Sequence, residues 1–333
     1  MSEVGLIGLG SIGGIYAEHL LKKWSHVVVS DQDEARIREL VAIGAESVDS
    51  PSELGEKCAT VLVSLPSPAA LKDAIIGVGT KPGAALLDGM ETGGVIIDAS
   101  TVDPGTSRFV YAEARARGVS YLDAPVSGGA PMEGGTDAAR AASLTWMVGG
   151  DYEAFERAKA VFEALGRKAF YLGPPGSGST VKIISNLVSG IYTIVVAEAF
   201  ALGAAAGFSP DVLAGVFQET DAKSYFMTDY LVPRLQREDY APGFKVQLQL
   251  KDHRLAEQLG KDLGIPLALN DEAVRFYESM CADRRGGNDV VDAVRYLAEL
   301  CNIEPRPVMT KREPYSREPR PGPFGPTTME GKT

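Results

Sequence analysis

The chain has 333 residues, of which 45% are hydrophobic and 23% are charged, an ordinary composition for a folded protein. Its length exceeds what one hydrophobic core usually organises, so we expect two domains. The formal net charge of -11 argues against nucleic acid and against an anionic membrane surface as partners, because both require a basic protein surface. A small anionic substrate stays compatible with this charge, since a local cluster of groups is enough to bind it.

The cysteines and histidines do not form recognisable metal or disulfide patterns. Cys58, Cys281 and Cys301 lie far apart and are odd in number. No two of the three histidines have i, i+4 spacing, so we expect no metal site. The N-terminal segment carries Glu3 and no basic region, which is not typical of a signal peptide. We therefore expect a reducing, cytoplasmic setting.

The first half of the chain alternates short apolar runs with segments of helical length. The apolar runs are predicted strands, several of them continuous and β-branched as in sheets buried on both faces. The predicted strands are residues 4–10, 26–31, 59–66, 94–101, 119–126 and 144–150. The predicted helices between them include 15–24, 33–44 and 106–118. This alternation predicts an α/β fold with a doubly wound parallel sheet of Rossmann type, which we assign to a domain over residues 1–175.

A glycine-rich loop directly follows the first predicted strand and opens the first predicted helix. Its three glycines have the GxGxxG spacing, in which the first permits a tight turn, the second lets the backbone approach a pyrophosphate, and the third lets helix and strand pack closely. A plain glycine turn is the alternative. We predict a cofactor-binding loop made of Gly8, Leu9, Gly10, Ser11, Ile12 and Gly13.

An acidic residue at the end of the next predicted strand supports dinucleotide binding and favours one cofactor. Asp31 lies 18 residues beyond Gly13, where a carboxylate can accept hydrogen bonds from the adenosine ribose. The same carboxylate would repel the additional phosphate of NADP, and Arg36 and Arg38 lie further along. We therefore predict NAD in preference to NADP.

The pattern changes to helices alone from about residue 176. Helical spacing covers 181–207, 209–220, 249–264 and 271–284, and strand-like alternation is absent. We predict an all-α domain over residues 176–303 that binds substrate and mediates oligomerisation. The segment 304–333 is rich in proline, glycine and charge, and we expect it to be disordered or to form an arm exchanged between subunits.

The most apolar of these helices carries two polar residues near its start. Glu198 and several small polar residues argue against a membrane span. Lys182 and Asn186 stand at i and i+4, so their side chains project from one face of the helix into the expected interdomain cleft. A buried lysine has a lowered pKa and can act as general acid and base. From the spacing alone, a lysine that reaches from the helix end to water remains the alternative.

Six motifs in order, over roughly residues 3–300, resemble the β-hydroxyacid dehydrogenase family. This family is typified by 3-hydroxyisobutyrate dehydrogenase and includes tartronate semialdehyde and glyoxylate/succinic semialdehyde reductases. The resemblance implies an NAD(P)-dependent oxidoreductase that acts on CH–OH groups of a small carboxylate-bearing substrate, and a homodimer or homotetramer. The motifs are GLIGLGSIGG, SLP, DAST, DAPVSGG, GSGSTVKIISN and LKDHRLA.

The resemblance also implies the roles of individual residues. Lys182 would be the catalytic acid/base, and Asn186 would orient the substrate. Ser127 and the backbone of Gly128 and Gly129 would hold the substrate carboxylate. Further cofactor contacts would come from Leu65, Pro66, Thr101 and Lys251, with Asp252 in the same patch as Lys251.

Three departures from the family pattern leave the identity of the substrate open. The family usually has two consecutive asparagines after the lysine, whereas this chain has Ser185 before Asn186. The segment 130–142 is longer than usual and borders the expected substrate pocket. Ala70 stands where the family often has an asparagine near the cofactor.

Other functions on this fold fit the residues less well. Imine reductases of the superfamily generally lack the lysine that is present here. A non-catalytic dinucleotide-binding scaffold would resemble the family with the lysine lost. A 6-phosphogluconate dehydrogenase is disfavoured by the small helical domain.

Overall fold

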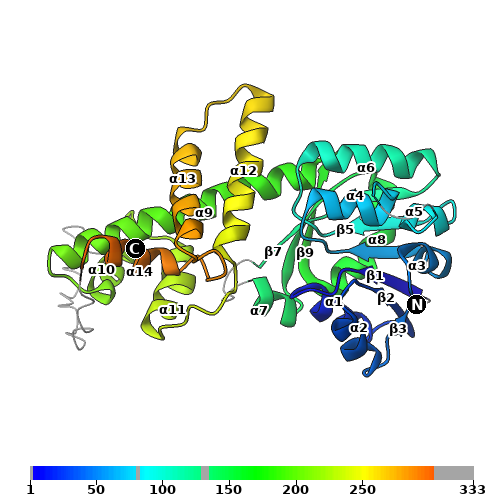
Figure 1. Ribbon diagram of the computed structural model, residues 1–333, viewed down its shortest axis with the longest axis horizontal. Coiled ribbons are helices and arrows are strands. Elements are labelled where there is room, and N and C mark those ends of the chain that lie inside the picture. The colour runs from blue at the N-terminus through cyan, green and yellow to red at the C-terminus, as the bar shows by residue number, and fades with distance from the viewer. Residues whose placement is uncertain (1–2, 80–82, 129–134, 304–333) are drawn as a thin grey trace, which may run out of the picture.

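The computed structural model describes residues 3–79, 83–128 and 135–303. A sheet flanked by helices forms the N-terminal part, and a group of helices follows it in the chain (Figure 1). Gly129, the first part of the long loop (130–134) and the tail 304–333 lie outside the described residues, so the predictions for them stay predictions.

The sheet has nine strands and is mostly parallel. The strands are β1 Glu3–Ile7, β2 His26–Ser30, β3 Glu46–Ser47, β4 Thr60–Val63, β5 Val95–Asp98, β6 Ser120–Asp123, β7 Val126–Ser127, β8 Leu144–Gly149 and β9 Gly166–Gly173. Their order is β3-β2-β1-β4-β5-β6-β8-β7, and β9 pairs with β8. The pairs from β3 to β6 are all parallel, with β1 at the point where the order reverses. The predicted α/β fold of Rossmann type is confirmed.

One part of the sheet differs from the sequence-based expectation of purely parallel strands. β8 runs antiparallel to β6 and β7, and it pairs in parallel with β9. The sequence did not identify β9, because most of its residues are exposed or half-buried and its letters, GRKAFYLG, form no continuous apolar run. An edge strand of this kind lacks the pattern that a doubly buried strand shows.

Helices connect most of the strands, and four of them begin at a residue whose side chain caps the first turn. They are α1 Gly13–Leu20, α2 Glu34–Val41, α3 Pro51–Lys57, α4 Pro68–Ile76, α5 Leu86–Gly89, α6 Pro104–Ala116, α7 Gly135–Arg140 and α8 Tyr152–Leu165. The side chains of Asp33, Ser50, Ser67 and Asp103 each accept a hydrogen bond from a backbone N–H of the first turn. Proline at the first position of α3, α4 and α6 pre-sets the helical φ angle there.

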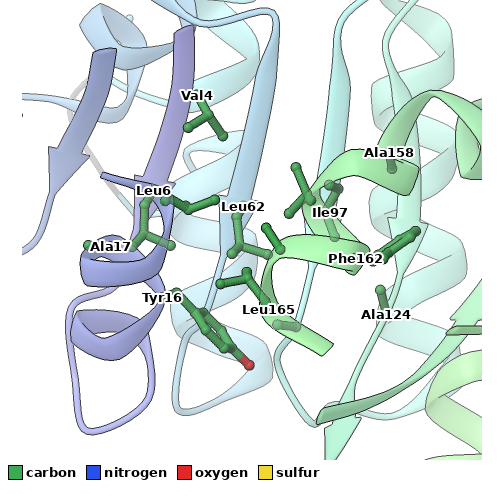
Figure 2. Close-up of a cluster of buried hydrophobic side chains, with 14 of the residues drawn as sticks. Val4, Leu6, Tyr16, Ala17, Leu62, Ile97, Ala124, Ala158, Phe162 and Leu165 are labelled. Carbon is green, nitrogen blue, oxygen red and sulfur yellow. The ribbon is translucent and has the colours of Figure 1, made fainter. Parts of the chain in front are cut away.

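The two faces of the sheet bury separate apolar clusters. Leu6 of β1 and Leu62 of β4 pack against α1 and α8 on one face, where Phe162 and Leu165 are contributed by α8 (Figure 2). Ile7, next to Leu6 in the chain, belongs to the cluster on the opposite face. Successive side chains of a strand point to opposite faces, so a sheet covered on both sides requires continuous apolar strands.

The C-terminal part of the described chain consists of helices and one isolated bridge between Lys245 and Asp289. The helices are α9 Ser177–Ala205, α10 Pro210–Phe217, the π-helix η1 Phe226–Leu231, α11 Val232–Gln236, α12 Val246–Leu263, α13 Ala268–Ala282 and α14 Asp292–Leu300. They share a third apolar core. α9 starts at the sheet and runs the length of the helical part, where it packs against α12 and α14 (Figure 1). The division into domains at residue 175 stays a prediction.

α9 is, among the described helices, the one long and apolar enough to cross a membrane by length and composition. One third of its most apolar window is buried within the chain. Core helices of folded proteins meet the same criterion, and α9 contacts β8, α12 and α14. The expectation that it does not span a membrane stays a prediction.

Candidate active site

The glycine loop has the geometry that a dinucleotide requires. Gly8 has a φ angle of 90°, and a Cβ there would lie 2.2 Å from the carbonyl oxygen of Ser64. A Cβ on Gly13 would lie 1.9 Å from the carbonyl oxygen of Gly8, so helix and strand can meet only without a side chain. At Gly10 a Cβ would meet nothing within 4 Å. The loop is thus closely packed on its inner side and open at Gly10, where a pyrophosphate would approach the N-terminal end of α1.

Asp31 lies against this loop, as its position after β2 predicts. Its Oδ2 accepts a hydrogen bond from the backbone N–H of Leu9 at 2.5 Å, and its Oδ1 accepts one from Asp33 at 2.8 Å. A carboxylate fixed beside the loop is suited to bind ribose hydroxyl groups and disfavours a further phosphate. The described residues therefore fit NAD.

The segments after β4 and β5 lie side by side next to the loop. The backbone N–H of Leu65 donates to Oγ of Ser100 at 2.9 Å, which joins the segment containing Pro66 to the segment containing Thr101. Because β1, β4 and β5 are parallel neighbours, these segments follow the same edge of the sheet as the glycine loop. The predicted cofactor residues from Gly8 to Thr101 thus lie at one edge of the sheet, where the parallel strands end.

Lys182 is buried in the first turns of α9. Its exposed fraction is 8%, and among the described residues its Nζ makes no hydrogen bond. Burial lowers the pKa of Lys182 from 10.5 to about 8, while Asp252 raises that pKa and Lys251 lowers it further. Removal from water disfavours the charged form, so this lysine is close to half neutral at a mildly alkaline pH.

Asn186 is joined to α12 by two hydrogen bonds. Its Nδ2 donates to Oδ2 of Asp252 at 2.5 Å, and its carbonyl oxygen accepts from Nε2 of Gln249 at 3.0 Å. Asn186 and Asp252 have exposed fractions of 7% and 1%. The bond to Asp252 fixes which way the carboxamide of Asn186 points.

Lys251 connects this pair to the cofactor edge of the sheet. Its Nζ lies 3.1 Å from Oδ1 of Asp252, too poorly aligned for a hydrogen bond. The same Nζ donates to the carbonyl oxygen of Thr101 at 2.8 Å. Residues predicted from three distant motifs, around Thr101, Asn186 and Lys251, are therefore in one connected polar cluster between the sheet and the helices.

The predicted substrate loop is only partly described. Ser127 ends the short strand β7, where it pairs with Thr145 of β8, and both Ser127 and Gly128 are half-buried. Among the described residues, no hydrogen bond joins either of them to Lys182 or Asn186. Their role in holding a carboxylate stays a prediction.

The sequence did not point to two polar residues of α12 at its crossing with α9, of which Gln249 donates to the Asn186 carbonyl. Gln249 and His253 lie one helical turn apart on the face of α12 that meets α9. A Cβ on Gly190 would lie 2.1 Å from Nε2 of His253 and 2.3 Å from Nε2 of Gln249, so the two helices cross closely at this glycine. The signal available in the sequence was Gly190 itself, an isolated glycine within a long apolar helix.

Two family models together cover nearly all of the described chain. Residues 3–173 match the NAD-binding domain of 6-phosphogluconate dehydrogenase, and residues 176–297 match the NAD-binding domain of NADP-dependent 3-hydroxyisobutyrate dehydrogenase. A probable mitochondrial 3-hydroxyisobutyrate dehydrogenase of Dictyostelium discoideum is 33% identical over 292 residues, which are 86% of this chain and 88% of the relative.

Two further relatives also match this chain over most of its length. An NAD-dependent L-serine dehydrogenase of Pseudomonas aeruginosa is 32% identical over 283 residues, 83% of this chain and 91% of the relative. A structure of Mycobacterium tuberculosis 3-hydroxyisobutyrate dehydrogenase with L-serine has a TM-score of 0.79 and 27% identity, and the match covers 89% of this chain and 99% of that one. The chain is thus a member of the β-hydroxyacid dehydrogenase family, an NAD-dependent oxidoreductase that acts on the CH–OH group of small hydroxy acids.

Proposed function

We propose that the enzyme interconverts a small β-hydroxy acid and its semialdehyde or keto form, with Lys182 as the general acid/base. The observation that carries this proposal is a lysine with an exposed fraction of 8% and a pKa near 8, one helical turn before a buried asparagine. General acid-base catalysis is most efficient when the pKa of the group lies near the working pH. A lysine that merely reached water would be exposed and would keep its ordinary pKa.

The proposed proton transfer follows from the protonation state of Lys182. Bound NAD supplies the hydride acceptor. Neutral Nζ of Lys182 accepts the hydroxyl proton during oxidation, and protonated Nζ donates it during reduction. With a pKa of about 8, the neutral form prevails above that pH and the protonated form below it, so both directions are accessible near neutrality.

Asn186 and the segment at Ser127 would hold the substrate in register. Asp252 accepts from one N–H of the Asn186 carboxamide, which leaves its second N–H and its Oδ1 for the substrate. Ser127, Gly128 and Gly129 would bind the substrate carboxylate. Correct orientation of this kind is worth several kcal/mol of the barrier, on the order of 7–11 in favourable cases.

The names of the relatives point to a class of substrate. Both 3-hydroxyisobutyrate and L-serine carry a primary alcohol on the carbon β to a carboxylate. We expect this chain to act on the same class, with the segment 130–142 selecting among its members. Imine reduction is disfavoured because Lys182 is retained.

We also propose that α9 mediates assembly into a homodimer or homotetramer. Apolar side chains at helical spacing form an exposed stripe along it, which we call the α9 stripe. Their exposed fractions range from 38% to 74%. Exposed apolar side chains in a continuous row require a cover. The α9 stripe comprises Val181, Ile184, Val188, Tyr192, Val195 and Leu202.

The test replaces the proposed base with an apolar residue of similar length. We expect Lys182→Met to lower kcat for NAD reduction by about 10²–10⁴-fold across a panel of β-hydroxy acids that the unaltered enzyme oxidises. Lys261→Met is the matched control, because Lys261 is an exposed lysine on α12. Unaltered turnover by Lys182→Met would contradict the lysine mechanism, and absence of turnover on every acid by the unaltered enzyme would contradict the substrate class.

A further inference from the structure

The helix that carries Lys182 receives its N-terminal cap from a distant strand. The N-cap residue of α9 is Gly176, which has no side chain to accept hydrogen bonds. Asp123, the last residue of β6, supplies both acceptors instead. Its Oδ1 accepts from the N–H of Gly176 and its Oδ2 from the N–H of Ser179, each at 2.8 Å. The carboxylate of a residue 53 positions earlier thus satisfies N–H groups that a helix start leaves open.

The first turn of α9 also lies directly on the strand ends. A Cβ on Gly178 would lie 2.2 Å from the carbonyl oxygen of Met147 in β8 and 2.4 Å from that of Asp123. Oγ of Ser179 lies 2.8 Å from Oγ of Ser107 on α6. Asp123, Ser107 and Ser179 have exposed fractions of 1%, 0% and 1%, so these contacts are fully buried. The start of α9 is fixed to the sheet at several points.

This arrangement sets the place of Lys182 relative to the cofactor edge. Lys182 follows the capped Ser179 by three residues, about 4.5 Å along the helix axis. β6 is a parallel neighbour of β5, so Asp123 and the glycine loop after β1 belong to the same edge of one rigid sheet. We propose that Asp123 is a positioning residue of the reaction, which holds the start of α9 on the sheet and thereby fixes Nζ of Lys182 beside the cofactor. This inference rests on the proposed role of Lys182.

Several charged groups lie near Lys182 and Asp123. Asp252 and Lys251 of α12 act on Lys182. Around Asp123, burial raises the pKa of its carboxyl group, and the N–H groups of Ser179 and Gly176 oppose this. Asp98 of β5 lies close enough to interact with Asp123 and accepts from the hydroxyl of Tyr121 at 2.6 Å. Removal of the Asp123 charge would by itself lower the pKa of Lys182, whereas loosening of the helix start would hydrate Lys182 and raise it.

Two variants test the proposal with the full-length enzyme. Asp123→Asn keeps one acceptor oxygen and Asp123→Ala keeps none. We expect kcat with a β-hydroxy acid to fall about tenfold and about a hundredfold respectively, since a displacement of about 1 Å can cost 10²-fold, while the KM for NAD is unchanged. We also expect the pH at which kcat reaches half its maximum to move upward from about 8. Ser209→Ala is the control, because it removes the buried cap of α10 and should lower thermal stability alone.

The outcomes separate a positioning role from a structural one. A lower melting temperature with unchanged kcat and unchanged pH profile, or a downward shift of that profile, would overturn the proposal. If neither Asp123 variant folds, Ser107→Ala removes the hydroxyl bridge to Ser179 and should shift kcat and the pH profile in the same directions by smaller amounts. An unchanged profile in Ser107→Ala would then count against it. Full activity in Lys182→Met would instead remove the proposed function itself, so the two failures are distinguishable.

Discussion

The two ends of α9 reverse the usual distribution of polar and apolar residues. In the first turns, Lys182 and Asn186 are buried, with exposed fractions of 8% and 7%. Further along, Val195 and Leu202 are apolar and exposed, at 53% and 74%. Polar groups are usually outside and apolar groups inside, so both departures call for an explanation. We attribute the buried polar residues to the proposed acid/base role of Lys182, and the exposed apolar residues to the proposed interface between subunits.

The largest effect that we expect at the buried end of α9 is a gain of stability when the charge of Lys182 is removed. The pKa of Lys182 in the folded protein, about 8, lies below its ordinary value of 10.5, so folding disfavours the protonated form. This penalty is fully present below pH 8 and is lost as the pH rises towards 10.5. We expect Lys182→Met to raise the free energy of unfolding by about 3 kcal/mol at pH 7. The measurement is urea denaturation at several pH values.

An exposed lysine supplies the control for the denaturation measurement. Lys261→Met should leave the free energy of unfolding nearly unchanged, because the side chain is 64% exposed. Equal stability of Lys182→Met and the unaltered protein at pH 7 would show that Lys182 is not held in a place that disfavours its charge.

Replacing Asn186 should lower both kcat and the free energy of unfolding. Asn186→Ala removes the donor to Asp252 and the group proposed to orient the substrate. We expect kcat to fall about ten- to hundredfold and the free energy of unfolding to fall by about 1–3 kcal/mol, because the buried carboxylate loses a partner. Ser189→Ala, which removes a hydroxyl that donates to the Asn186 carbonyl, is the control on the same helix. Equal kcat in both variants would separate Asn186 from the reaction.

The smallest effect on kcat is expected for substitutions at the exposed, C-terminal end of α9. The double substitution Val195→Lys and Leu202→Lys places charges on the α9 stripe. We expect a lower molar mass by light scattering at equal protein concentration and a kcat within about twofold of the unaltered enzyme, since single surface changes away from the site are usually small. An unchanged molar mass would exclude the α9 stripe as the interface.

Part of the candidate site follows from the sequence. The glycine loop and Asp31 were predicted from local spacing within a strand, turn or helix. Spacing placed Lys182 and Asn186 on one helix face, and the resemblance to the family supplied their proposed roles, which stay predictions. The cluster that joins Thr101, Lys251 and Asp252 was predicted as a set of family positions, and the structure supplies its contacts.

The parts that sequence missed depend on long-range packing. The cap of α9 comes from Asp123, and the local residue, Gly176, gives no sign of it. The bond between Asn186 and Asp252 joins residues 66 positions apart. The strand β9 lies at an edge and lacks the apolar pattern of the inner strands. None of these contacts follows from periodicity, because each is set by how separate elements meet.

The pH dependence of kcat for NAD reduction tests whether Lys182 is the group that gives and takes the proton. With a β-hydroxy acid at saturating concentration, we expect kcat to rise with pH and to reach half its maximum near pH 8, as Lys182 becomes neutral. The residual activity of Lys182→Met should lack this rise. The same rise near pH 8 in Lys182→Met would contradict this role of Lys182, because another group would then carry the proton.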